Sequence, residues 1–221
     1  MSHPHETAAP GASDGRIEKP EGPLRTGWTT GACATAATKA ALTALITGVF
    51  PDPVTIRLPR GEEPAFALAI EAIGEGSAMA GIVKDAGDDP DVTHGATVVA
   101  SVRPLQPGSG IRFAAGDGVG IVTRPGLPIA VGEPAINPVP RAMMTAEVEA
   151  LCAAHGLPAD IEITLFIPGG DRIAEKTWNP RLGIVGGLSV LGTTGVVHPF
   201  SCAAWIHSIH RGIDVARAEG M

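Results

Sequence analysis

The chain has 221 residues and a formal net charge of −7, a length that allows one or two domains and a charge that argues against nucleic acid as a partner. Hydrophobic residues make up 44% of it, but they form no run long enough to span a bilayer, so we predict a globular protein without a membrane partner. The 29 glycines and 20 prolines follow no period, which excludes collagen. Three widely spaced cysteines favour a reducing cytoplasm over a disulfide framework.

Residues 1–23 contain no apolar core, and we expect a disordered tail there rather than a secretory signal. Periodicity and turn residues then predict elements along the rest of the chain. Helices are expected over 29–46, 141–155 and 199–218, and strands over 54–58, 65–73, 79–84, 96–102, 111–114 and 161–167, with 173–176 pairing beside the last. A Gly-rich turn with a short strand (116–123), a Pro-rich loop (125–140) and an apolar Gly-rich stretch (182–191) lie between them. This order predicts an α+β fold with a mixed or antiparallel sheet and packed helices.

Thr29, Thr30 and Gly31 stand directly before an Ala-rich helix. A helix start offers unpaired N–H groups and a positive dipole end, which suit an anion. The alternative, given equal weight, is a capped helix whose small residues allow close packing. The same Thr-Thr-Gly sequence recurs at 193–195, again just before a helix, so the two loops could hold carboxylates of one polyanionic ligand. For the second loop the alternative is a tight turn.

Residues 84–95 bring Asp85, Asp88, Asp89 and Asp91 together with one lysine and one histidine. Clustered carboxylates are expected to raise each other's pKa, which would suit acid–base work or a hard cation. The EF-hand spacing is absent, and an ordinary solvated turn is the interpretation that the residues alone favour. His207 and His210 lie three positions apart in the last expected helix and could form a metal pair, but a solvated helical face is the favoured interpretation, so we predict no metal site in the protein.

Two further stretches are rich in glycine. Residues 116–126 resemble a GxGxxG motif, but no helix follows, so we reject a dinucleotide site. Asn137, in the loop that follows, could bind a ligand, although turn chemistry explains it more simply. Residues 176–197 alternate glycine with β-branched residues, and Lys176 and Arg181 at their start are either carboxylate partners or plain surface charges.

Four ordered stretches together resemble the CbiD family, the cobalt-precorrin C1-methyltransferases of the anaerobic cobalamin pathway. They are RTGWTTGACATAATKAAL, KDAGDDPDVTHG, GDGVGIVTRPGLPIAVGEPAINPVPR and KTWNPRLGIVGGLSVLGTTGVVHPFS. The resemblance implies methyl transfer from S-adenosylmethionine to carbon 1 of cobalt-precorrin-5B, giving cobalt-precorrin-6A, with cobalt present only within the substrate. It also implies an α+β domain like a permuted ribosomal-protein second domain over 24–195. We expect 196–221 to lead toward a second α/β domain that this chain lacks, and a homo-oligomer is possible.

Roles follow from charge and position as hypotheses. Proton transfer is assigned to Asp85, Asp88, Asp89 and His94, with Asp91 as a further candidate. S-adenosylmethionine binding is assigned to Gly186, Gly187, Gly192, Thr193, Thr194 and Gly195. Substrate binding is assigned to Arg25, Thr29, Thr30, Gly31, Lys84, Arg124, Asn137, Lys176 and Arg181. The alternatives are a small-metabolite kinase with a Gly/Thr phosphate loop and a non-catalytic corrinoid-binding protein.

Overall fold

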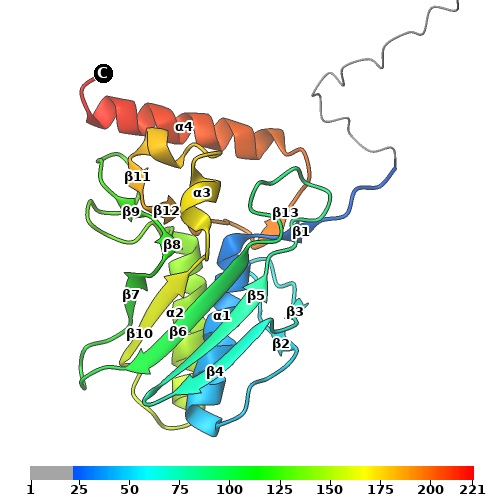
Figure 1. The fold of residues 1–221 in the computed structure, drawn as a ribbon, viewed down its shortest axis with the longest axis vertical. Coiled ribbons are helices and arrows are strands. Elements are labelled where there is room, and N and C mark those ends of the chain that lie inside the picture. The colour runs from blue at the N-terminus through cyan, green and yellow to red at the C-terminus, as the bar shows by residue number, and fades with distance from the viewer. Residues whose placement is uncertain (1–21) are drawn as a thin grey trace, which may run out of the picture.

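A five-stranded mixed sheet is the centre of the computed structural model, which describes residues 22–221 (Figure 1). Its strands in spatial order are β4 (Ile70–Gly74), β5 (Ser77–Val83), β6 (Thr97–Pro104), β10 (Ile161–Phe166) and β7 (Arg112–Ala115). Neighbouring strands are antiparallel except β10 and β7, which are parallel. Alternate residues of β10 are buried, as a strand with one face on a core requires.

The Ala-rich helix α1 (Thr30–Thr47) packs against β5 and β6 on one side and against helix α2 (Pro138–Ala154) on another. It is buried almost all round, and its alanines from Ala32 to Ala41 are fully inaccessible. A methyl side chain lets the sheet and the second helix both approach its backbone closely, which explains why this helix is so rich in alanine. It ends at Gly48, whose φ of 80° is the left-handed conformation of a helix C-cap.

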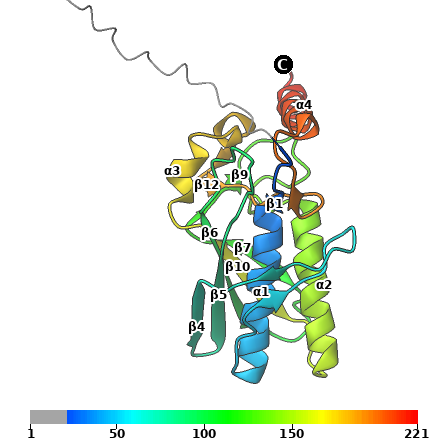
Figure 2. The ribbon, with the colours of Figure 1, turned by 90° about the vertical axis from the view of Figure 1, so that its right-hand side faces the viewer.

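The helices α1 and α2 run parallel, with their N-terminal ends on the same side of the molecule (Figure 2). Pro140 packs directly on Gly31, where a Cβ atom would lie 2.7 Å from the proline ring. One ion pair further along joins Lys39 Nζ and Glu147 Oε2 at 2.9 Å. Both helix starts therefore face the same group of loops.

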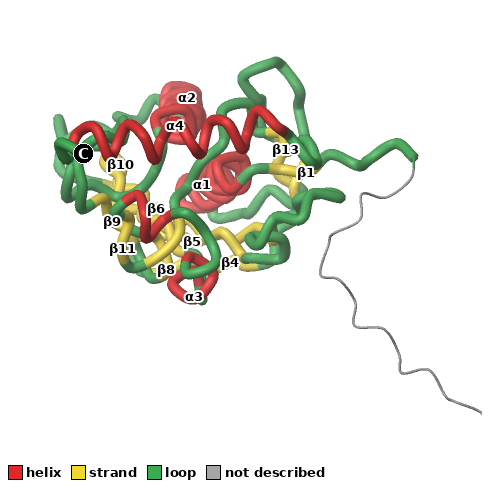
Figure 3. Tube along the Cα trace, turned by 90° about the horizontal axis from the view of Figure 1, so that it is seen from above, coloured by secondary structure: helices red, strands yellow, loops and turns green. Residues whose placement is uncertain are grey.

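Four short two-stranded ladders complete the strands. One of them pairs β2 (Val54–Thr55) with β3 (Ala65–Phe66) and lies beside the middle of α1. The other three lie at the end of the sheet where both helices start, and they pair β1 (Gly27–Trp28) with β13 (Val196–Val197), β8 (Gly118–Val119) with β12 (Gly187–Leu188), and β9 (Ile121–Val122) with β11 (Ile184–Val185). A short helix α3 (Gly170–Ala174) and a 3-10 turn η1 (Asn179–Leu182) pack beside them. The last helix, α4 (Cys202–Ala218), crosses over this end, and Figure 3 shows it from above.

The structure confirms an α+β fold with a mixed sheet, and it corrects three details of the predicted elements. Residues 173–176, expected as a strand beside β10, lie in and after α3, because β6 and β7 already occupy both edges of β10. The strand expected over 65–73 is divided into β3 and β4, which pair with different partners. Helix α2 begins at Pro138 inside the expected loop, since proline is well suited to a first helical turn.

The expected tail (1–23) falls outside the described residues except for its last two positions, which are exposed. The likeness to a ribosomal-protein domain and the boundaries at 24, 195 and 196 stay predictions. Within residues 22–221, no helix combines the length and apolar character needed to cross a bilayer.

Candidate functional site

Three of the sequence motifs meet at the N-terminal end of α1. Strand β1 lies between the acidic loop (84–95) and β13, with the Trp28 N–H donating to the Asp85 carbonyl at 2.7 Å. The next N–H, that of Thr29, donates to the carbonyl of Gly195 at 3.0 Å. The fold thus brings the two Thr-Thr-Gly loops and the acidic loop together from positions far apart in the chain.

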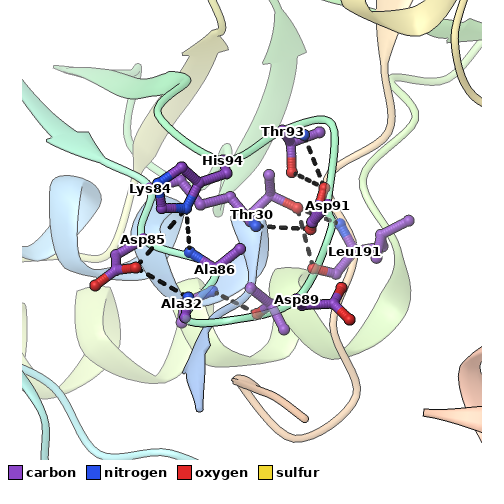
Figure 4. Close-up of polar contacts among 12 residues, drawn as sticks. Thr30, Ala32, Lys84, Asp85, Ala86, Asp89, Asp91, Thr93, His94 and Leu191 are labelled. Atoms are coloured by element: carbon purple, nitrogen blue, oxygen red, sulfur yellow. Dashed lines mark hydrogen bonds and ion pairs between the residues drawn. The ribbon is translucent and has the colours of Figure 1, made fainter. Parts of the chain in front are cut away.

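The start of α1 is closed by acceptors of the chain itself. Thr29 Oγ1 accepts the N–H of Ala32 at 3.2 Å, and the Leu191 carbonyl accepts the N–H of Gly31 at 3.0 Å. The same carbonyl accepts the Thr30 hydroxyl at 3.2 Å (Figure 4). These donors are used within the protein, so the structure favours the capped, closely packed helix over an anion site at Thr29, Thr30 and Gly31.

The second Thr-Thr-Gly loop packs onto the first without a gap. A Cβ atom at Gly192 would lie 2.3 Å from Thr29 Oγ1, and one at Gly195 would lie 2.5 Å from Leu58. Thr194 Oγ1 accepts the N–H of Val196 at 3.3 Å, whereas Thr193 is exposed. Close packing explains these glycines, and Thr193 is the exposed residue of this loop.

Asp85 holds the acidic loop onto the segment before β1. The Arg25 guanidinium donates to both of its carboxylate oxygens, with Nη2 at 3.0 Å from Oδ1. Hydrogen bonds from Arg25 and from the Gly87 N–H lower the pKa of Asp85 to about 2. The pKa of Arg25 is raised by the same contact. Next to it, Asp88 Oδ2 accepts the backbone N–H of Arg25 at 2.6 Å.

Lys84 and Asp91 form an ion pair under the same loop (Figure 4). Lys84 Nζ lies 2.7 Å from Asp91 Oδ2, and only 2% of the lysine side chain is exposed. Burial opposes ionisation of Asp91, but the charge of Lys84 and hydrogen bonds from Lys84 and Thr93 outweigh it and lower the pKa. The expectation of raised pKa values is therefore wrong for Asp85 and Asp91, since each has its own cation. Lys84, expected to bind substrate, instead points into the protein.

The two remaining predicted acid–base residues differ in their surroundings. Asp89 Oδ1 accepts the N–H of Phe200 at 2.9 Å and so ties the loop to the segment before α4. His94 Nδ1 accepts the N–H of Ala86 at 3.1 Å, which leaves Nε2 to carry the proton of a neutral ring. The His94 side chain is 54% exposed, so its ring is open to a ligand, and Asp88 is exposed as well.

A second group of predicted residues lies near α4. Lys176 and Arg181 line one open depression of about 360 Å³ together with Glu175, Thr177, Trp178 and Pro180. The Arg181 guanidinium lies over the Trp178 ring, 5.2 Å from its centroid. Among the described residues, no carboxylate is within ion-pair distance of Lys176 or Arg181. The depression therefore presents free cations beside an aromatic face.

Asn179 lies between two residues that line this depression, and neither Asn179 nor Trp178 is among the site residues predicted from the sequence. The buried Asn179 side chain donates to the Gly187 carbonyl at 3.2 Å and accepts the Ser189 hydroxyl at 3.2 Å. An asparagine before a proline is typical of a turn, so its sequence gave no signal of this long-range role.

The other predicted ligand residues lie apart from this depression. Arg124 pairs with Glu219 at 3.5 Å, and Asn137 caps α2 without a side-chain hydrogen bond to it. A Cβ atom at Gly187 would lie 2.2 Å from the Gly118 carbonyl oxygen, so that glycine serves strand packing. Gly186 is exposed with nothing close to it, and it remains open to a ligand.

Comparison with known proteins decides the family. The CbiD family model matches residues 17–199. The chain belongs to the CbiD family. A Brucella anthropi relative named cobalt-precorrin-5B C(1)-methyltransferase is 71% identical over 97% of this chain and 57% of its own length. A Brucella canis relative of the same name is 75% identical over 89% of this chain and 54% of its own length.

A solved structure supports the same assignment. The crystal structure of a cobalamin biosynthesis protein (cbiD) from Archaeoglobus fulgidus aligns with a TM-score of 0.60 and 29% identity. The alignment covers 84% of this chain and 58% of that one. This CbiD-family chain thus spans somewhat more than half the length of the relatives it matches.

Proposed function

We propose that this chain takes part in the methylation of carbon 1 of cobalt-precorrin-5B, with S-adenosylmethionine as the methyl donor. The observation that carries the proposal is the identity of 71–75% to proteins named for that reaction, over 89–97% of the chain. Because the chain spans just over half the length of those proteins, we propose that it supplies part of their active site and not all of it. None of the relatives named above supports a kinase or a corrinoid carrier.

The proposed step is a displacement at the methyl carbon. A C–C bond forms to ring A, the C–S bond breaks, and its electron pair stays on the sulfur of S-adenosylhomocysteine. The electron-rich ring carbon is the nucleophile, so the protein needs no nucleophilic side chain. Its work is to align the two substrates and to keep water out. Asp85, Asp88, Asp89 and His94 stay predictions for any proton transfer, and of these Asp88 and His94 are exposed.

The depression at η1 supports the substrate side of the proposal. A corrinoid precursor is a flat ring edged with carboxylates. Lys176 and Arg181 offer charge-assisted hydrogen bonds to carboxylates, and Trp178 offers a flat apolar surface. For the methyl donor the predicted residues stay a prediction, and at Gly187, Gly192 and Gly195 neighbouring protein atoms leave no room for a side chain. Gly186 and Thr193 are the open members of that predicted set.

The test is a methyl-transfer assay with S-adenosylmethionine labelled in its methyl group. Product of the mass expected for one added labelled methyl group, formed from cobalt-precorrin-5B, would support the proposal. The Brucella anthropi relative serves as the positive control. Calorimetry on this chain with the cobalt-corrinoid, with S-adenosylmethionine and with ATP gives a second readout. Binding of ATP alone, or of none of the three under conditions where the relative binds the corrinoid, would contradict the proposal.

A further inference from the structure

Helix α4 carries a row of large apolar side chains that point away from the protein. Trp205, Ile206, Ile209 and Ile213 are 66%, 54%, 46% and 46% exposed, and we call these four residues the α4 apolar face. Their spacing places them on one side of the helix. Scattered apolar residues are normal on a surface, but a contiguous row that includes a tryptophan marks an interaction site.

The helix is held along a different side and mainly at its C-terminal half. Val215 is buried against Val122, Leu182 and neighbouring residues, and the backbone at Asp214 touches Gly126. Residues 202–207 are exposed throughout, although Asp89 fixes the chain just before them. In Figures 1 and 3, α4 lies across the end of the molecule, beyond the sheet and the short ladders. The described residues therefore leave the α4 apolar face without a partner.

The relatives indicate what covers this face. The alignment with the Brucella anthropi protein spans 97% of this chain, so it includes most of α4, yet it leaves more than two fifths of the relative unmatched. In the relative, a counterpart of α4 thus shares one polypeptide with a large further portion. The polar residues of α4 include Asp214 beside its histidines and arginines, Glu219 follows directly after the helix, and the chain carries a charge of −7. Both features disfavour an anionic membrane surface as the occupant.

We infer that the α4 apolar face docks the portion of the CbiD-family protein that this chain does not match, whether that portion is carried on the same polypeptide or on another. Gly212 of α4 faces Trp178, at the depression lined by Lys176 and Arg181. The docked portion would therefore lie beside that depression and help to enclose a ligand there. This last consequence rests on the proposed function, whereas the docking itself does not.

Hydrogen exchange measured by mass spectrometry tests the docking on whole proteins and needs no activity. We compare residues 202–213 of this chain with the aligned segment of the Brucella anthropi relative. Amides of this segment should exchange about 100-fold more slowly in the relative, because docking must open before they exchange. The amides of α1 should be protected in both proteins and serve as the control. Equal exchange of the α4 segment in the two proteins would overturn the inference.

Substitutions identify the face and the occupant. In the relative, substitution by aspartate at the position aligned with Ile209 should speed exchange of that segment, whereas the same substitution at the position aligned with Val49, an exposed apolar site after α1 in this chain, should not. In this chain alone, Ile209→Asp should leave the thermal midpoint unchanged within a few degrees. Unchanged protection in the substituted relative would refute the docking. So would protection of α4 in this chain that rises with its concentration, because a second copy would then be the occupant.

Discussion

At the scale of single residues, the acidic loop is a set of paired carboxylates. Asp85 binds Arg25, Asp88 binds the backbone of Arg25, Asp89 binds the backbone of Phe200, and Asp91 binds Lys84. Each carboxylate therefore fixes one nearby segment. In the sequence, the clustering of these carboxylates suggested a catalytic or cation site. In the structure, the same carboxylates hold β1, the loop and the segment before α4 in place.

The Lys84–Asp91 pair gives the first prediction. Asp91→Asn leaves a lysine that is 2% exposed without its counter-charge, so we expect the free energy of unfolding to fall by about 3 kcal/mol. Lys84→Met should cost less, because it leaves a carboxylate that is 25% exposed and that water can reach. Urea unfolding followed by circular dichroism measures both. A larger loss for Lys84→Met than for Asp91→Asn would contradict this account of the pair.

Asp85 gives a prediction on pH. Its pKa in the folded protein is about 2, below the usual value of about 3.9, so the folded state binds this proton less readily than the unfolded chain. Its contribution to stability is thus complete above about pH 4 and is lost as the pH falls toward 2. In Arg25→Gln the pKa of Asp85 should rise toward the usual value, whereas Arg57→Gln should leave it low. Carbon-13 NMR of the carboxyl group measures it, and an unchanged midpoint in Arg25→Gln would refute the assigned cause.

At the scale of elements, local patterns predicted much of the fold. The Thr cap and the alanines placed the helix now seen as α1 within one residue, and apolar alternation placed β5, β6 and β10 within a few residues. Local patterns could not show that both edges of β10 are taken, so the strand expected over 173–176 was wrong. They also could not show whether Asp85 meets an arginine or a ligand, because Arg25 lies sixty positions away.

Local sequence patterns also could not show which glycines are required by a close approach of two backbones. One such glycine, Gly27, gives the third prediction. Strand β1 crosses the acidic loop so closely that a Cβ atom at Gly27 would lie 2.1 Å from the Ala86 carbonyl carbon. Gly27→Ala should therefore destabilise the protein by about 3 kcal/mol, since two backbones must move apart. Gly212→Ala in α4 meets nothing closer than 3.9 Å and should be neutral or slightly stabilising. Thermal unfolding of the two variants distinguishes them, and equal effects would contradict the close crossing.

At the scale of the whole molecule, the distribution of charge matters more than its total. The chain carries −7, which repels a polycarboxylate, so binding depends on cations that the protein has not already paired. Arg25, Lys84, Arg124 and Arg141 each have a carboxylate partner. Lys176 and Arg181 have none among the described residues, and both line the depression at η1. Other described arginines, such as Arg57 and Arg217, also lack a carboxylate partner, but Lys176 and Arg181 lie together beside the aromatic surface of Trp178.

This distribution gives the last prediction. Arg181→Ala removes one charge-assisted hydrogen bond and the cation over Trp178, so affinity for a cobalt-corrinoid polycarboxylate should fall about tenfold. Arg172 is exposed on α3 and lies outside the depression, so Arg172→Ala removes the same charge at another place. If the position of the charge decides binding, and not the net charge, this variant should change the affinity less than twofold. Calorimetry at two salt concentrations measures both, and the wild-type affinity should weaken with added salt more than that of Arg181→Ala. Equal losses for the two arginines would show that the overall charge, and not this depression, governs binding.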